Sequence, residues 1–305
     1  MAWYKAMKKG MVCRGKQYQE NTDYEEKGAD SCCNEGVMHF CKEPMDVLEY
    51  YPLVDENGDF SDFVEVEPLG DVLQDGNKYA SKKIHIGAKL GFKGFIEAAV
   101  DFLIEKTKPE KVGKKKDGYA AQIGSSGRYA QIGSSGYAAR IGSSGRYAQI
   151  GSSGDAARIG SSGDDARIGS SGDDAQIGSS GRYARIGSSG DDARIGSSGD
   201  DAQIGSSGRY AQIGSSGRYA RIGSSGDDAI IKCEADHAVV VCAGKRAKVK
   251  APKGTWITLA EYGEWDGENY PCICVKSAQI DGKKLKADTL YTLKNGEFTE
   301  VENDD

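Results

Sequence analysis

The sequence predicts a mainly β fold. In it, a central two-sided β-roll, or β-solenoid, of nonapeptide repeats lies between an α+β N-terminal domain and a small all-β C-terminal domain. The first observation is the pentapeptide Ile-Gly-Ser-Ser-Gly, which occurs 12 times at nine-residue spacing between Ile123 and Gly226. The second is that these copies hold 24 of the 42 glycines of the 305-residue chain, so the regions on either side have ordinary globular composition. We therefore expect three domains, at residues 1–117, 118–231 and 232–305.

Each nonapeptide predicts one short strand and one tight turn. Ala-x-Ile alternates apolar and polar side chains with the period of two that is typical of a half-buried strand. Gly-Ser-Ser-Gly has turn composition, because glycine supplies a positive φ angle without steric cost. Stacked copies would place Ile and Ala inside, Tyr and Arg outside, and Ser-Ser along both narrow edges.

The charged positions favour a coil of about 18 residues, which is two nonapeptides. At that spacing the residues alternate in sign, so opposite charges on neighbouring coils would lie about 4.8 Å apart. The alternating set is Arg146, Asp164, Arg182, Asp200 and Arg218. A nine-residue coil would instead stack three aspartates, Asp155, Asp164 and Asp173. The repeats then form about six coils, and such a rigid rod suits a spacer or stalk.

The N-terminal region predicts strands at residues 3–7, 63–68 and 83–86, and two helices. Residues 44–51 begin with a proline, which favours the first turn of a short helix. Residues 94–106 have apolar side chains at spacings of three and four, which predicts the longer helix. Residues 111–116 form a basic connector to the first coil, and we expect it to be a solvated linker.

The C-terminal region predicts strands at residues 238–242, 256–260 and 273–275. Asp281-Gly282 and Asn295-Gly296 are dipeptides typical of β-hairpin turns. This region follows the last Ala-x-Ile directly. We therefore expect it to cap the open edge of the roll, which would otherwise recruit other strands.

Composition limits which cellular compartment and which partners we expect for this chain. No run approaches the roughly 18 apolar residues of a membrane span, so we expect no contact with a membrane. The first residues contain no apolar segment of signal-peptide length, which favours a cytoplasmic location with reduced cysteines. The net charge of −6 argues against binding to nucleic acid. We expect instead a protein partner or self-association, and the head is where a small ligand would bind.

A calcium site is the alternative interpretation of the acidic repeat copies. The nine-residue length is similar to that of RTX repeats, whose turns bind calcium through aspartate. On that pattern, the ligand position is taken in five copies by Asp165, Asp174, Asp192, Asp201 and Asp228. Five other copies carry Tyr there, so we expect surface aspartates balanced by arginine, with no metal and no cofactor.

The two ends of the chain carry a resemblance to a known family. The stretches in the head are residues 4–6, residues 36–51, and the segment Cys13-Arg14-Gly15-Lys16-Gln17-Tyr18. With residues 254–261 and 288–298, they resemble a family of uncharacterised bacterial and phage-associated proteins. In that family such a head precedes a short-repeat region and a small β tail follows. The resemblance implies this three-part order and a phage or mobile-element setting, with no assigned activity.

The regular repeat and the lack of a catalytic motif favour a non-enzymatic structural or binding protein that presents a globular head on a rigid β-solenoid. An inhibitor or sponge of a host defence factor is one alternative. Another is an enzyme in the head, because residues 36–51 are similar to a strand–helix segment of ADP-ribosyltransferase-like folds. The candidate residues are then Tyr4, Arg14, His39, Tyr50 and Glu65, with Cys41 as a candidate thiolate nucleophile beside His39.

Overall fold

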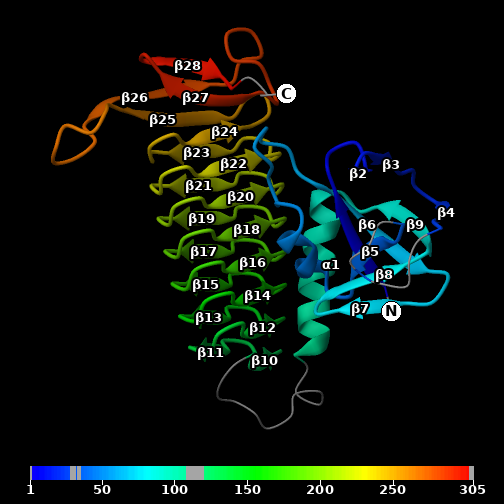
Figure 1. The fold of residues 1–305 in the computed structure, drawn as a ribbon. Coiled ribbons are helices and arrows are strands. Elements are labelled where there is room, and N and C mark those ends of the chain that lie inside the picture. Colours follow the sequence, from blue (N-terminus) through cyan, green and yellow to red (C-terminus); the bar gives the residue numbers. More distant parts are fainter. Residues whose placement is uncertain (1, 28–31, 33–35, 108–119, 302–305) are drawn as a thin grey trace.

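The computed structural model describes residues 2–27, 32, 36–107 and 120–301, drawn as a coloured ribbon in Figure 1. These residues form a head, a β-roll and a C-terminal cap. The expected basic connector at residues 111–116 lies outside the described residues. Within the described part of the chain, none of the helices combines the length and the apolar character needed to cross a membrane.

An antiparallel sheet lies at the centre of the head, and its described strands follow the order β4-β9-β6-β1-β5-β8-β7. The strands are β1 (Trp3–Met7), β4 (Thr22–Glu25), β5 (Met38–Cys41), β6 (Asp62–Pro68), β7 (Leu73–Asp75), β8 (Lys78–Ser81) and β9 (Lys83–Lys89). A separate antiparallel ribbon consists of β2 (Val12–Cys13) and β3 (Lys16–Gln17). The strands expected in the head are thereby confirmed.

Both faces of the head sheet are buried. One face packs against η1 (Pro44–Glu49) and α1 (Gly91–Lys106), and the rings of Phe63 and Phe95 stack there with their centroids 3.8 Å apart. The opposite face has its own core, which includes Met11. Both expected helices are confirmed, although the first is a 3₁₀ helix and the second begins earlier than its apolar pattern indicates.

Two parallel sheets form the β-roll, and each strand of the nonapeptide repeat pairs with the strand 18 residues further along the chain, as Ile159 does with Ile177. The covered sheet contains β10 (Gln122–Ser125), β12 (Arg140–Ser143), β14 (Arg158–Ser161), β16 (Gln176–Ser179), β18 (Arg194–Ser197), β20 (Gln212–Ser215), β22 (Ile230–Cys233) and β24 (Lys248–Lys250). The open sheet contains β11 (Gln131–Ser134), β13 (Gln149–Ser152), β15 (Arg167–Ser170), β17 (Arg185–Ser188), β19 (Gln203–Ser206), β21 (Arg221–Ser224), β23 (Val239–Cys242) and β25 (Trp256–Tyr262). The two-sided roll with 18 residues per coil is confirmed.

Rows of Ala, Ile and Ser fill the interior of the roll. Ala157, Ile159 and Ser161 are all fully buried, and equivalent residues repeat along the stack. The expectation that Ser-Ser lines the edges is therefore wrong for the first serine of each pair. That serine ends its strand two residues after Ile, and strand alternation turns both side chains inward.

The turn glycines have a different role from the expected one. The positive φ angles of the described repeats belong to Tyr, Asp and Ala, such as Tyr183 (59°) and Asp192 (56°), and to none of the repeat glycines. From Gly145 onward, the second glycine of the copies instead allows close backbone approach, since a Cβ atom on Gly181 would lie 2.1 Å from the carbonyl oxygen of Gly163. Coil stacking, rather than turn conformation, requires glycine here.

Charged side chains pair along the edges of the roll as the alternating pattern predicts. Arg182 donates its backbone N–H to Asp164 Oδ1 at 2.9 Å, and its guanidinium lies 3.7 Å from the same carboxylate. Like-charged neighbours use the same backbone contact, because Asp173 donates its N–H to Asp155 at 3.0 Å. An aspartate at this position therefore satisfies a backbone donor of the next coil, whatever residue follows it.

The stack of coils continues past residue 231, so the described roll has about eight coils rather than the six expected. Cys233 and Cys242 pair in register with Ser215 and Ser224, and both cysteines are buried in the serine row. The pentapeptide is lost in these coils, but an apolar residue still occupies the inward position of Ile. The expected domain boundary at residues 231–232 thus falls inside the stack.

The C-terminal strands close the end of the roll. In the open sheet, β25 pairs antiparallel with β26 (Cys272–Gln279). In the covered sheet, β24 pairs antiparallel with β27 (Leu290–Lys294), which pairs in turn with β28 (Glu297–Glu300). Antiparallel strands therefore follow the last parallel strand of each sheet, which agrees with the expected cap.

The two predicted hairpin turns of the cap have different outcomes. Asn295 and Gly296 connect the paired strands β27 and β28, and both have positive φ, so this turn is confirmed. The prediction for Asp281-Gly282 is wrong, because β26 and β27 belong to different sheets. Asp281 Oδ1 instead accepts the backbone N–H groups of Lys283 and Lys284, each at 2.8 Å, which orders a longer connection.

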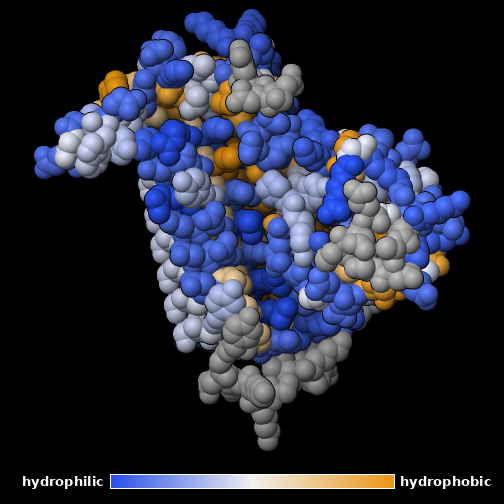
Figure 2. Space-filling model, in the orientation of Figure 1, coloured by the Kyte–Doolittle hydropathy of each residue, from blue (hydrophilic) through white to orange (hydrophobic). Residues whose placement is uncertain are grey.

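The head lies along the side of the roll. Figure 1 shows α1 between the head sheet and the covered sheet, where it runs along the stack and contacts strands from β10 to β18. The open sheet lies on the side of the roll away from α1. Hydrophilic residues cover most of the face shown in Figure 2. This arrangement differs from a head held at the tip of a stalk.

Candidate functional site

A pocket of about 180 Å³ opens in the head, between β1, β5, η1 and the turn that follows β2. Its lining brings together five predicted candidates: Tyr4, Arg14, His39, Cys41 and Tyr50. The other lining residues are Lys5, Ala6, Cys13, Phe40, Val47, Tyr51 and Lys78. A space of this size suits a small ligand.

Lys5 is the central charged group of this pocket. Its side chain is 5% exposed, and Nζ donates a hydrogen bond to the carbonyl oxygen of His39 at 2.8 Å. No Asp or Glu among the described residues lines the pocket, and Lys5 forms no ion pair with any of them. Burial lowers the pKa of Lys5, because the ammonium loses its hydration. The pocket therefore contains a buried amine without an anionic partner.

Further cations and aromatic rings surround this amine. Arg14, in the tight turn between β2 and β3, has a φ of +50° and an exposed side chain. Lys78 Nζ lies 5.1 Å from the ring centroid of Tyr50, whose hydroxyl donates to Asn77 Oδ1 at 2.7 Å. The Tyr51 hydroxyl lies 3.1 Å from the sulfur of Cys13. The lining is thus both cationic and aromatic.

Cys41 and His39 line the pocket together, but they do not form a nucleophile–base pair. Burial raises the pKa of Cys41 to about 12, with Asp46 and Glu49 adding to the shift, so the thiol stays neutral. Burial also lowers the pKa of His39, and its Nε2 donates to the carbonyl oxygen of Cys32. Cys41 therefore supplies no thiolate for covalent chemistry.

Glu65 lies away from the other candidates. It is paired with Tyr4 across β6 and β1, and it lines a separate hollow with Leu90 and Asp101. Tyr4 borders both spaces. The structure therefore brings the predicted cationic and aromatic residues together and leaves the predicted carboxylate outside.

The sequence did not predict a site role for Lys5, Cys13 or Lys78. A signal for Lys5 was present, because a lysine lies at the centre of the otherwise apolar strand Trp3–Met7 and would be buried with its neighbours. Lys78 has no such local signal. It reaches the pocket because β8 pairs with β5, where Lys78 lies opposite Cys41.

The five calcium candidates lie on the two edges of the roll. Asp165, Asp174, Asp192, Asp201 and Asp228 all have positive φ angles. The Asp228 carboxylate binds the Arg246 guanidinium, with Oδ1 2.7 Å from Nε, and Asp165 lies 3.4 Å from Arg146. Across the described ranges, His, Cys, Asp and Glu form no group of three or more that could hold a metal ion.

Comparison with known families places the pocket in a recognised segment. Residues 1–98 match the family described as "Domain of unknown function (DUF7666)". The resemblance of the head to an uncharacterised family is thereby confirmed. Every residue that lines the pocket lies within the matched segment, whereas the roll and the cap lie outside it. No curated protein and no solved structure matches the chain.

Proposed function

We propose that this chain is a non-enzymatic binding protein whose head holds a small anion in the pocket around Lys5. The observation that supports the proposal is the buried Lys5 ammonium, which faces a pocket without carboxylates. A buried charge without a counter-charge destabilises the protein. An anionic ligand would supply that charge and would raise the pKa of Lys5 towards its ordinary value.

The remaining lining explains how such an anion would be held. Arg14 at the rim offers a planar group suited to carboxylate or phosphate oxygens. Tyr4 and Tyr50 offer ring faces for the organic part of the ligand. The volume of about 180 Å³ suits a small organic part.

The chemistry of the pocket favours binding over turnover. The neutral Cys41 thiol is a poor nucleophile, and no lining carboxylate among the described residues is available as a general base. An ADP-ribosyltransferase-like activity has less support, because Glu65 lies in a different hollow from Arg14, His39 and Tyr50. Sequestration of a small anion agrees with the alternative of a sponge for a host defence factor, in the phage or mobile-element setting that the resemblance implies.

The roll would then act as a rigid platform that supports the head and offers a surface to a protein partner. α1 belongs to both cores, because Phe92 and Ile96 pack in the head while they cover glycines of the roll. We place this binding protein in the cytoplasm, where its cysteines would remain reduced.

Isothermal titration calorimetry on the full chain tests the proposal, with inorganic phosphate and benzoate as probes. We expect saturable binding of at least one probe, weakened about tenfold or more by Lys5→Met and by a smaller factor by Arg14→Ala. Lys5→Met is expected to fold, because methionine fills similar space without a buried charge. Binding should also weaken as the pH rises through the lowered pKa of Lys5, because the neutral amine attracts anions less.

Lys8→Met is the matched control, because Lys8 is exposed and lies outside the pocket. It removes the same charge from the chain and should leave the affinity unchanged. Two results contradict the proposal: neither probe binds, or Lys5→Met and Lys8→Met bind the probes equally well.

A further inference from the structure

The two sheets of the roll carry equivalent rows of outward-facing glycines, but these rows have different surroundings. On the covered sheet, a Cβ atom on Gly196 would lie 2.4 Å from Ile96 of α1. On the open sheet, a Cβ atom on any of the equivalent glycines would have nothing within 4 Å. Those glycines are Gly133, Gly151, Gly169, Gly187, Gly205 and Gly223. They form a shallow groove, called here the glycine groove, that no described residue occupies.

The covered sheet shows what such a row of glycines accepts. Phe92, Ile96, Val100 and Leu103 of α1 lie against successive glycines of the covered sheet. One helical turn rises about 5.4 Å and one coil about 4.8 Å, so each turn of the helix meets about one coil. An apolar ridge at spacings of three and four therefore fits a row of glycines that recurs once per coil.

The glycine groove has the dimensions of a helix site. Six glycines at about 4.8 Å per coil extend over about 24 Å, which is the length of about 16 helical residues. α1 itself has 16 residues. Towards the cap the groove is closed by Val241, which pairs in register with Gly223 and is exposed beside Val239.

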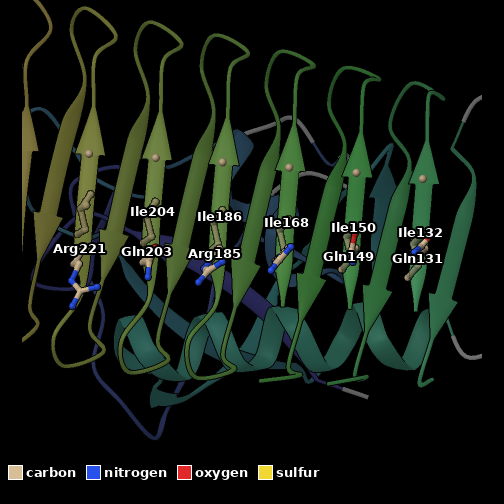
Figure 3. A pocket seen from close by; sticks show the side chains of 18 of the residues that line it. Gln131, Ile132, Gln149, Ile150, Ile168, Arg185, Ile186, Gln203, Ile204 and Arg221 are labelled. Carbon is tan, nitrogen blue, oxygen red and sulfur yellow. The ribbon is translucent and has the colours of Figure 1, made fainter. Parts of the chain in front are cut away.

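Charges beside the two glycine rows indicate the chemistry of the occupant. On the covered sheet, Arg158 Nη1 lies 2.7 Å from Asp46 and Nη2 lies 2.9 Å from Glu49, both from η1. The open sheet carries the corresponding row of Gln and Arg side chains, several of which Figure 3 labels along one side of the groove. Its arginines, Arg167, Arg185 and Arg221, form no ion pair with any described residue.

We propose that the glycine groove binds an amphipathic α-helix of a partner protein. The helix would place an apolar ridge over the glycines and carboxylates beside Arg167, Arg185 and Arg221. The inference concerns a different surface from the head pocket and does not rest on the proposed anion binding. Glycine in an exposed strand costs stability relative to a β-branched residue, so a groove of six glycines weakens the free sheet. A bound helix that fills the groove would offset this loss.

A second copy of this chain is a less suitable occupant. Two open sheets placed face to face would bring their arginine rows into the same interface without carboxylates to neutralise them. An acidic helix satisfies both features of the surface, since it fills the groove and supplies the counter-charges that η1 supplies on the covered sheet.

Fluorescence anisotropy with a labelled synthetic helical peptide tests the inference on the full chain. The probe keeps the ridge of Phe92, Ile96, Val100 and Leu103 and carries glutamate along both flanks, and a control peptide carries lysine there instead. We expect saturable binding of the glutamate peptide and much weaker binding of the lysine peptide. Gly169→Val with Gly187→Val should weaken binding of the glutamate peptide about tenfold or more, because valine fills the groove.

Arginine variants separate groove binding from general attraction to a basic surface. Arg167→Gln with Arg185→Gln should weaken binding several-fold. The matched pair Arg182→Gln with Arg218→Gln, at the edge and outside the groove, should not. The inference is overturned if the glutamate peptide does not bind, or if the valine and groove-arginine variants bind it as tightly as the parent chain. It is also overturned if sedimentation shows a dimer that Gly169→Val with Gly187→Val converts to a monomer, because the occupant is then a second copy.

Discussion

The covered and open sheets of the roll have nearly the same sequence and the same interior, yet their outer faces have different surroundings. The covered sheet is an internal interface, where glycines make room for α1 and Arg158 pairs with carboxylates of η1. The open sheet repeats these features without a partner among the described residues. Identical nonapeptides therefore do not imply identical roles, because the surroundings of each face decide what a glycine or an arginine contributes.

The largest expected difference between the two faces concerns glycine. Gly142→Val should destabilise the chain by about 3 kcal/mol, because it forces a side chain into α1. A Cβ atom on Gly142 would lie 2.3 Å from Thr107 Oγ1 and 3.0 Å from the carbonyl oxygen of Leu103. Gly151→Val, at the equivalent position of the open sheet, should leave stability unchanged or raise it by up to about 1 kcal/mol.

Urea unfolding of both variants and the parent chain measures this difference, and far-UV circular dichroism checks that each variant keeps the β-roll. Equal destabilisation by Gly142→Val and Gly151→Val would show that both glycine rows serve the roll itself. The distinction between a filled and an empty groove would then fail.

The second difference concerns arginine. Arg158→Met should destabilise the chain by about 2 kcal/mol, because it leaves the buried Asp46 beside Glu43 and Glu49 without their shared cation. Arg185→Met is the matched change on the open sheet, and we expect an effect within about 0.5 kcal/mol. Thermal unfolding at neutral pH compares the two variants. A similar loss in both would mean that the arginine side chains stabilise the sheet rather than the contact with the head.

The repeat could be interpreted so far from the sequence because one short pattern is copied many times. The alternation of apolar and polar residues around Ile predicted the two sheets. The alternating sign of charges such as Asp164 and Arg182 predicted the 18-residue coil. The predicted role of the repeat glycines was wrong, because composition does not show whether a glycine is needed for a positive φ angle or for close approach of two backbone segments. Tyr183 has the positive φ, whereas Gly181 faces a carbonyl oxygen of the neighbouring coil.

The site could be predicted from the sequence only in part, because the pairing of strands in the head sheet decides which candidate residues meet. Arg14, His39, Cys41 and Tyr50 meet in one pocket, but their distance from Glu65 follows from the order of strands in the head sheet. The coils after the last pentapeptide were not predicted, for a related reason. Cys233 replaces a serine that was expected at an edge, so its place in the buried row only becomes visible once the stack is known.

A third difference is expected in the pH dependence of stability. Burial at the covered sheet raises the pKa of Asp46 to about 7, although Arg158 opposes the shift. A free aspartate titrates near pH 4, so the folded chain holds this proton more tightly than the unfolded chain does. Stability from this group is therefore full below about pH 4 and falls as the pH rises to about 7, by up to about 1.4 kcal/mol per pH unit. Asp46→Asn should remove this slope.

Asp191, at a narrow edge of the roll, should behave in the opposite way. The backbone N–H and the guanidinium of Arg209 lower the pKa of Asp191, so its contribution is present at neutral pH and is lost as the pH falls through that lowered value. Unfolding of the parent chain, Asp46→Asn and Asp191→Asn between about pH 2 and pH 8 measures both directions. If Asp46→Asn follows the parent curve, the contact between the head and the covered sheet does not bury that carboxylate in solution. The two faces would then differ less than their side-chain contacts indicate.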